Sequence, residues 1–203
     1  MQTEKKGQRT RQRILESAMD LLNTKSYHAT TMNDIISATG VQKGNLYYYF
    51  QGKEALVADL VKAAGKSYGE YLSERAGNGT PIERLCGILD GVLDYHRNKG
   101  LKGGCLFGNL AMETADTVPV VAESVKWVLD SGIDWLAALI AKTGIRENAK
   151  SGADARSMAI QIVAEIEGSI LLARLGRDIS ILENAVNALK TELIKKMSGV
   201  SGS

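Results

Sequence analysis

The chain contains 203 residues, of which 44% are hydrophobic and 24% are charged, a composition that excludes disordered and collagen-like chains. No apolar run approaches the roughly 20 residues of a membrane span, and the charged N-terminus lacks the apolar segment of a secretory signal. Two cysteines are too few for a disulfide framework. We therefore expect a cytoplasmic protein without a membrane partner.

Positive charge is concentrated near the N-terminus. Residues 1–53 hold eight Lys or Arg and four Asp or Glu, a net charge of +4, whereas residues 54–203 hold 17 basic and 19 acidic residues, a net charge of −2. A basic front end on a slightly acidic body fits a polyanion partner bound at that end. A solvated basic tail would leave the same pattern, so charge alone does not decide between the two.

Hydrophobic spacing predicts an all-α fold with about nine helices. Residues 10–24 place apolar side chains at i, i+1, i+4, i+7 and i+8, which is one stripe of an amphipathic helix. Thr31 is a good N-cap for a short helix over 32–39, which Gly40 terminates, and a third helix follows over 42–49. Further helices are expected at 53–73, 82–98, 105–116, 120–142, 154–175 and 179–197. No segment alternates with the period of a strand.

The segment 31–50 has the organisation of a helix-turn-helix. Two short helices are joined by a tight turn that contains a glycine, whose backbone freedom lets the helices cross closely. At about 100° per residue, Leu46 and Phe50 share the buried face of the second helix. Tyr48 then points away from that face, and of the three consecutive tyrosines we expect Tyr47 to be the partly packed one. Aromatic rings kept outward beside amide and lysine side chains indicate a surface that contacts a partner.

Residues 10–56 resemble the DNA-binding domain of the TetR family of bacterial transcriptional regulators. The matching positions, besides the apolar spacing of the first helix, are Thr31, Gly40, Val41, Lys43, Gly44, 46–50 and 53–56. The sequence departs from the family pattern at Ile36, Gln42, Tyr49, Gln51 and Gly52. The resemblance implies a helix-turn-helix domain over 1–56, with the motif at 31–50. It also implies a dimer whose third helices enter the major groove of a pseudo-palindromic, double-stranded operator, at half-sites about one turn apart or more.

The resemblance assigns DNA-contacting roles by position. The candidates for the major groove are Gln42, Lys43, Asn45, Tyr47 and Tyr48, with Gly44 allowing close approach of a backbone. The candidates for phosphate contacts are Thr31, Asn33, Tyr49 and Lys53, and a flexible basic arm would carry Lys5, Lys6, Arg9 and Arg11. Amide side chains pair with adenine edges, lysine with guanine or phosphate, and the tyrosine hydroxyl with phosphate.

Residues 57–197 form a body that the family uses for dimerisation and for binding a small molecule. The helices expected over 154–175 and 179–197 carry apolar stripes that suit a four-helix dimer interface. An ordinary intrachain core would show the same spacing, so the stripes do not separate the two. The last residues, 198–203, are expected to be a flexible tail.

The segment 103–113 resembles a subgroup of the family in which a Gly-Cys-Leu pattern opens the sixth helix. Cys105 would then lie at a helix N-terminus, where the amide dipoles favour a thiolate and hence a sensor of electrophiles or oxidants. The alternative for Cys105 is a small buried hydrophobe. We expect a pocket for an unknown small-molecule effector, lined by Cys105, Phe107, Asn109, Leu110, Glu113, Trp127, Glu165 and Arg174, together with Leu106 and Trp135.

These features predict a sequence-specific DNA-binding regulator, a homodimeric repressor released from its operator by a small-molecule or thiol-reactive effector. The alternative is an all-α protein- or ligand-binding interaction module with no DNA partner, which the charge asymmetry and the outward tyrosines disfavour. Neither an enzyme nor a cofactor is expected. His28 and His96 have no Cys or His at metal-ligand spacing, and no nucleophile signature is present.

Overall fold

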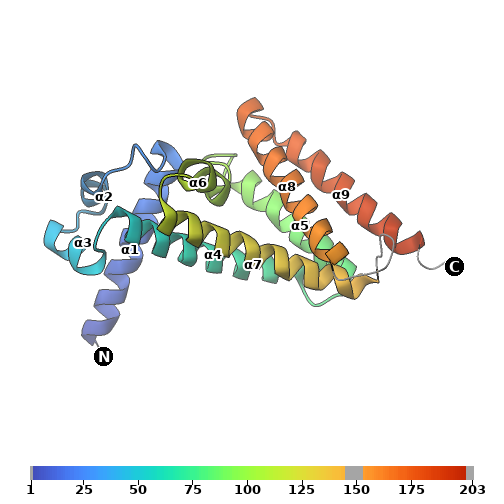
Figure 1. Cartoon of the computed structure of the whole chain (residues 1–203), viewed down its shortest axis with the longest axis horizontal. Helices are drawn as coiled ribbons and strands as arrows, with labels where there is room; N and C mark the ends of the chain where they lie inside the picture. Colours follow the sequence, from blue (N-terminus) through green and yellow to red (C-terminus); the bar gives the residue numbers. More distant parts are fainter. Residues whose placement is uncertain (1, 145–152, 200–203) are drawn as a thin grey trace. The chain divides into compact units, whose positions relative to one another are not determined.

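The computed structural model describes residues 2–144 and 153–199. This part of the chain forms nine α-helices and no strand, which confirms the all-α expectation (Figure 1). The helices are α1 (Gln2–Lys25), α2 (Met32–Thr39), α3 (Lys43–Tyr49), α4 (Lys53–Ala76), α5 (Pro81–Asn98), α6 (Leu106–Thr114), α7 (Pro119–Thr143), α8 (Ala153–Gly176) and α9 (Ser180–Gly199). Of the expected tail, residues 198 and 199 close α9 and the others lie outside the described residues.

The first helix starts earlier than its apolar spacing predicts. α1 begins at Gln2 rather than near residue 10, so the segment expected to be a basic arm forms the first turns of a helix. Long charged and amide side chains have good intrinsic helix propensity, and this propensity accounts for the earlier start. Apolar spacing could not reveal it, because residues 2–9 contain no apolar side chain that would set a period.

The chain divides into two compact units, each built from two separate stretches. The head unit comprises Met1–Lys66 and Leu106–Val128, and the body unit comprises Ser67–Cys105 and Leu129–Ser203. α4 and α7 therefore each contribute residues to both units, and the division expected at residues 56 and 57 falls inside α4. Across the described ranges, no helix is both long and apolar enough to cross a membrane.

The head unit packs its first three helices and the start of α4 around a core of aliphatic side chains (blue to cyan in Figure 1). Ile14 of α1, Ile35 of α2, Leu46 of α3 and Leu56 of α4 are fully buried. Burying one such side chain stabilises the fold by about 1.5–3 kcal/mol relative to leaving it exposed. Because each helix contributes at least one of these side chains, the core fixes which face of α3 turns outward.

The two ends of α2 confirm the expected cap and stop. The Asp34 backbone N–H donates to Thr31 Oγ1 at 3.1 Å, and the Thr31 backbone N–H donates to Asp34 Oδ2 at 2.8 Å. This reciprocal pair satisfies two backbone donors that a helix N-terminus otherwise leaves open. Gly40 ends the helix with φ at +64°, a left-handed conformation that glycine adopts without steric cost. The turn then leads directly into α3.

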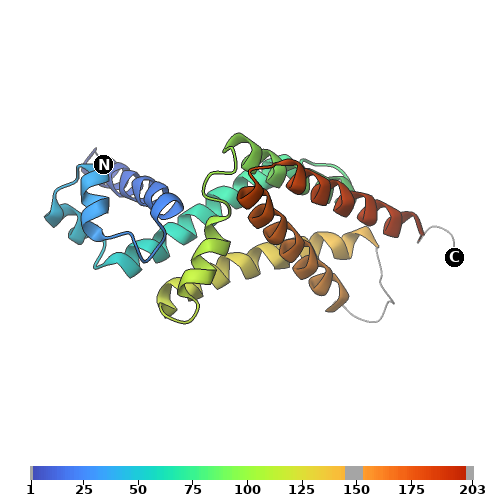
Figure 2. The same ribbon diagram turned by 90° about the horizontal axis from the view of Figure 1, so that it is seen from above.

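The body unit holds its core among α5, α8 and α9. α8 contacts α9, and α5 also packs against α9. Figure 2 shows α8 (brown) and α9 (red) running apart from the turn that joins them. Leu85 of α5, Ile162 of α8, and Leu182 and Val186 of α9 are buried members of one hydrophobic cluster. Most of the apolar residues expected on the last two helices are therefore intrachain core, whereas Leu171 and Leu175 of α8 are exposed.

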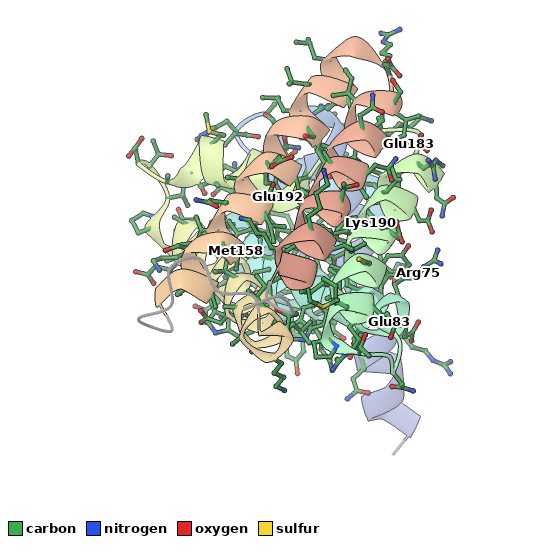
Figure 3. The ribbon with its side chains drawn as sticks, turned by 90° about the vertical axis from the view of Figure 1, so that its right-hand side faces the viewer. Arg75, Glu83, Met158, Glu183, Lys190 and Glu192 are labelled. Atoms are coloured by element: carbon green, nitrogen blue, oxygen red, sulfur yellow. The ribbon has the colours of Figure 1, made fainter. Side chains whose placement is uncertain are left out.

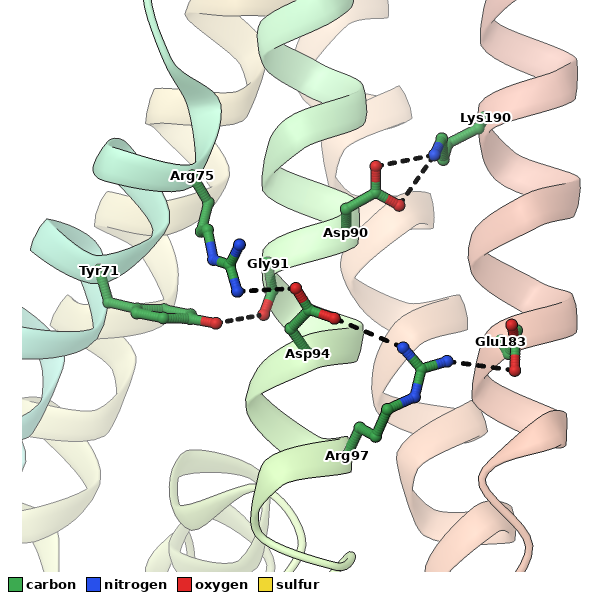
Figure 4. Close-up of polar contacts among 8 residues, drawn as sticks. All are labelled: Tyr71, Arg75, Asp90, Gly91, Asp94, Arg97, Glu183 and Lys190. Carbon is green, nitrogen blue, oxygen red and sulfur yellow. Dashed lines mark hydrogen bonds and ion pairs between the residues drawn. The ribbon is translucent and has the colours of Figure 1, made fainter.

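Polar contacts hold α4 and α9 against α5 (Figure 4), and a glycine of α5 allows a close contact with α4. Asp94 lies 2.7 Å from Arg75 and 3.4 Å from Arg97, which also pairs with Glu183 of α9 at 3.2 Å. Such exposed ion pairs contribute only about 0–1 kcal/mol each. A Cβ on Gly87 would lie 2.4 Å from the Arg75 carbonyl oxygen, so only glycine permits this approach. The other contacts are Lys190 with Asp90 at 2.8 Å and the Tyr71 hydroxyl with the Gly91 carbonyl at 3.2 Å.

Candidate nucleic-acid interface

α3 buries one face and exposes the other, as its spacing predicts. Leu46 is fully buried and Phe50, directly after the helix, is 2% exposed. Tyr48 is 83% exposed and Tyr47 is 42% exposed. The other exposed residues of this segment are Gln42, Lys43, Gly44 and Asn45. Burying a tyrosine-sized ring elsewhere would stabilise the chain by about 2 kcal/mol, so α3 keeps its aromatic and amide side chains outward at a cost to stability.

Tyr49, rather than Tyr47, is the most deeply packed of the three tyrosines. It is half-buried, and its hydroxyl lies 3.4 Å from where a Cβ would stand on Gly7 of α1. Its ring meets the Tyr48 ring edge-on, with centroids 5.2 Å apart and planes at 80°. Tyr47 is partly packed, as expected. The deeper packing of Tyr49 was not foreseen, because the first turns of α1, which reach Tyr49, were not predicted. Tyr49 therefore supports the exposed ring of Tyr48 from behind.

The start of α2 adds a second polar surface to the head unit. Thr31 and Asn33 are exposed, but the Thr31 hydroxyl already donates to Asp34 Oδ2 at 2.8 Å. Hydrogen bonds from the Thr31 backbone and from Lys25 lower the pKa of Asp34 to about 2. Asp34 is therefore anionic at neutral pH and is paired with Lys25 at 3.0 Å. Of the two candidates for phosphate contacts here, Thr31 therefore already has its hydroxyl and its backbone N–H bonded within the cap.

Two basic residues expected at the DNA surface also make contacts within the head unit. Lys53 donates from Nζ to the carbonyl oxygens of Tyr27 at 3.1 Å and Thr30 at 3.2 Å, and lies 4.1 Å from the centroid of the Tyr27 ring. Arg11 pairs with Asp59 at 2.6 Å and lies over the Phe50 ring. Lys43, in contrast, is exposed on α3 itself.

The residues expected to line an effector pocket fall in different units. Cys105, Glu165 and Arg174 belong to the body unit, whereas the remaining five belong to the head unit. The head-unit members are Phe107 and Leu110, both buried, Asn109, Glu113 and Trp127, which is 59% exposed. Of the two further residues, Leu106 is partly buried in the head unit and Trp135 packs partly buried against the body core.

Within the body unit the expected residues make separate contacts. Arg174 donates to the Gly103 carbonyl oxygen at 3.2 Å. Glu165 lines a surface groove between α8 and α9. Two other residues of this groove, Met158 and Glu192, are labelled in Figure 3. Cys105 directly precedes α6, as expected, and its thiol is hydrogen-bonded to the Glu167 carboxyl.

Glu167 is the residue of this region that sequence reasoning missed. Burial raises the pKa of its carboxyl, and the hydrogen bond from Cys105 partly offsets this effect. Nearby, burial raises the pKa of the Tyr68 hydroxyl well above its usual value. In the sequence, Glu167 lies between Ile166 and Ile170, which are both buried. An acidic residue among apolar positions of a helix is the sequence feature that could have identified it. In the described ranges, no group of three or more His, Cys, Asp or Glu side chains could hold a metal ion.

Family models match most of the chain. The model of "Bacterial regulatory proteins, tetR family" matches residues 14–65, and that of "Tetracyclin repressor-like, C-terminal domain" matches residues 81–189. The first range contains α2 and α3, and the second contains most of the body.

Full-length relatives and a solved structure agree with these matches. The chain is 28% identical over 195 residues to an HTH-type transcriptional regulator from the lacX 3′ region of Lactococcus lactis subsp. lactis, covering 92% of this chain and 94% of the relative. It is 26% identical over 172 residues to the HTH-type transcriptional regulator LmrA of Bacillus subtilis, covering 81% and 86%. The crystal structure of a TetR transcriptional regulator from Chloroflexus aurantiacus is 32% identical, with a TM-score of 0.82 over 94% of this chain and 96% of that one.

Proposed function

The chain belongs to the TetR family of bacterial transcriptional regulators, and from this premise we propose that it is a homodimeric repressor acting on a pseudo-palindromic operator. Its helix-turn-helix relatives regulate transcription, so the chain is a DNA-binding regulator and not an enzyme. The place of action that we propose is the cytoplasm, where a bacterial chromosome is accessible.

The outward face of α3 carries the DNA-binding proposal. Tyr48 is 83% exposed, and Asn45, which lies one helical turn before it, and Lys43 are exposed as well, on a helix whose opposite face is locked in the head-unit core. In the major groove, Asn45 and Gln42 could each pair with an adenine edge, and Lys43 with guanine or phosphate. Gly44 has no atom within 4 Å of its Cβ position, so a nucleic-acid backbone can approach there.

A second copy of the chain fits the outward face of α8. Leu171 and Leu175 are exposed there, and Gly168 has no atom within 4 Å of its Cβ position. These three residues follow at i, i+3 and i+7 and so share one face of the helix. Burying two leucines from each copy, at about 1.5–3 kcal/mol per side chain, is the scale of gain that a stable dimer requires. α8 and α9 of both copies would then form a four-helix contact.

For the effector, we propose that it acts in the body unit at the Cys105–Glu167 contact. Cys105 is the last residue of its stretch in the body unit, and Leu106, which opens α6, resumes the head unit. A small molecule or a thiol-reactive compound that breaks this contact would alter the chain where one unit continues into the other. A hundredfold loss of operator affinity needs only about 2.7 kcal/mol of coupling between the two sites.

An electrophoretic mobility shift with the DNA upstream of the chain's own gene tests the proposal. We expect a complex of two chains per duplex whose log affinity falls linearly with log salt concentration, by about 0.9 per phosphate contacted. The complex should survive an excess of unrelated DNA of the same length. Equal affinity for both DNAs, or one chain per duplex, would contradict the proposal.

A further inference from the structure

One carboxylate ties α6 to the turn that precedes the helix-turn-helix. Glu113 lies in the last turn of α6, and its Oε2 accepts from the backbone N–H of Tyr27 at 2.7 Å and of His28 at 3.3 Å. In return, His28 Nε2 lies 2.9 Å from the Glu113 carbonyl oxygen, which accepts its hydrogen. Glu113 is 86 positions from Tyr27 and 85 from His28 in the sequence, yet all three lie in the head unit.

The turn that Glu113 holds is also held from its other side. The Tyr27 ring is buried, and Ser26 has a φ of +75°, a conformation that a side chain rarely adopts. Lys53 of α4 donates to the Tyr27 carbonyl oxygen. The backbone of Tyr27 is therefore hydrogen-bonded to Glu113 through its N–H and to Lys53 through its C=O. Hydrogen bonds from N–H groups to an ionised carboxylate are stronger and shorter than neutral ones. The turn is therefore a fixed junction of α1, α4 and α6.

The position of this junction bears on α2 and α3. Thr31, the N-cap of α2, follows the turn directly. α2 in turn packs its buried Ile35 into the core that α3 shares through Leu46. A shift of α6 would therefore be passed through Glu113 to the start of α2 and on to the exposed face of α3.

We propose that Glu113 is a positioning residue for operator binding, which couples α6 to the DNA-reading helices. The proposal rests on the proposed DNA-binding function, and it assigns Glu113 to the head unit's internal linkage rather than to an effector pocket. Because coupling between two sites is reciprocal, operator DNA bound at α3 must also stabilise α6. That reciprocal effect can be measured without knowing the effector.

Amide hydrogen exchange, with and without a duplex that the wild-type chain selects from a random-sequence pool, measures the coupling. In the wild type we expect DNA to slow exchange about tenfold in α2, in α3 and at the end of α6. In Glu113→Ala the slowing in α2 and α3 should persist, while that in α6 falls below about twofold. Glu113→Gln keeps an acceptor oxygen for the Tyr27 N–H and should restore the α6 response. Glu123→Ala removes an exposed carboxylate from α7 of the same unit and should behave as the wild type.

The outcomes separate this inference from the function on which it rests. A wild-type chain that selects no duplex contradicts the proposed function itself. A wild type that binds DNA without slowing exchange in α6, or a Glu113→Ala chain whose α6 responds fully, overturns the role of Glu113 alone. A purely structural role would instead speed exchange throughout the head unit, with and without DNA. Should Glu113→Ala fail to fold, His28→Ala removes one link of the junction and should still reduce the α6 response about threefold.

Discussion

The outward faces of α3 in the head unit and of α8 in the body unit both keep large side chains in solvent, but their chemistry differs. On α3 the exposed ring of Tyr48 has a hydroxyl, and the other exposed residues of this segment include amides and a lysine. On α8 the exposed Leu171 and Leu175 have no polar atom, and Gly168 leaves room beside them. The first face suits a wet, charged partner such as a duplex, and the second suits a dry protein contact.

The largest effect is expected on dimer affinity, when charges are introduced into the apolar outward face of α8. Leu171→Asp combined with Leu175→Asp would place carboxylates in the proposed α8 contact, where burying an unpaired charge is costly. We expect the dimer dissociation constant, measured by sedimentation equilibrium, to rise by about a thousandfold or more. Val120→Asp, at an exposed apolar position of α7 in the head unit, serves as the control and should leave it unchanged. An undisturbed dimer in the double variant would show that α8 is not the interface.

A smaller effect is expected from a change on the outward face of α3, and it should be limited to DNA binding. Tyr48→Ala removes the exposed ring without touching the buried Leu46 face, so the dimer should stay folded. Operator affinity in a gel-shift titration should fall about a hundredfold, the loss of one central recognition side chain. Met112→Ala, a more exposed residue on α6, is the matched control. If Tyr48→Ala left operator affinity unchanged, the main support for DNA binding by the outward face of α3 would be lost.

The two units should also respond differently to acid. His96 of α5 is buried, and burial lowers its pKa from 6.5 to about 4. Because the unfolded chain binds a proton more readily, stability is lost as pH falls from about 6.5 towards 4. We expect the free energy of unfolding to drop by about 2 kcal/mol from this group between pH 7 and pH 5. His96→Phe should lack this drop in thermal unfolding at the two pH values, and an equal drop in the variant would exclude His96 as its cause.

In the head unit, Asp34 has its pKa lowered to about 2, so its contribution is present at neutral pH. That contribution is lost only as pH falls from about 3.8 towards 2, below the range in which His96 acts. If the head unit melted between pH 7 and pH 5 while the body unit stayed folded, the expectation that the body unit is the more acid-sensitive of the two would be wrong.

The smallest effect distinguishes two lysines of the head unit that carry the same charge. Lys43→Ala should lower the salt slope of operator binding by about one charge, because its side chain is exposed on α3. Lys53→Ala should instead lower the free energy of unfolding by about 1–2 kcal/mol, because its ammonium holds two backbone carbonyls. Salt-dependent anisotropy and thermal unfolding of both variants check this. If both variants lowered the salt slope equally and neither lost stability, Lys53 would be a DNA-contacting residue like Lys43.

Local patterns predicted α2 and α3 well, because their determinants lie within a few residues. Thr31 and Asp34 form a cap three residues apart, Gly40 supplies its own backbone freedom, and Leu46 and Phe50 are one helical turn apart. The faces of α3 therefore followed from the sequence alone.

The contacts that were missed join residues far apart in the sequence. Glu113 meets the backbone of Tyr27, and Gly7 meets the hydroxyl of Tyr49, through packing that no local spacing encodes. For the same reason the motif that suggests a phosphate contact for Lys53 did not reveal its partners within the chain, the carbonyls of residues 27 and 30. The body was predicted less well than the head, since an apolar stripe does not say whether it faces its own chain or a second copy.

Protection of guanine N7 from methylation on the operator tests the central claim most directly, because N7 lies in the major groove. The account predicts two protected clusters, related by two-fold symmetry and about ten base pairs or more apart, that disappear when Tyr48→Ala replaces the wild type. A wild-type complex that leaves N7 reactive, or clusters that persist unchanged without the Tyr48 ring, would contradict it.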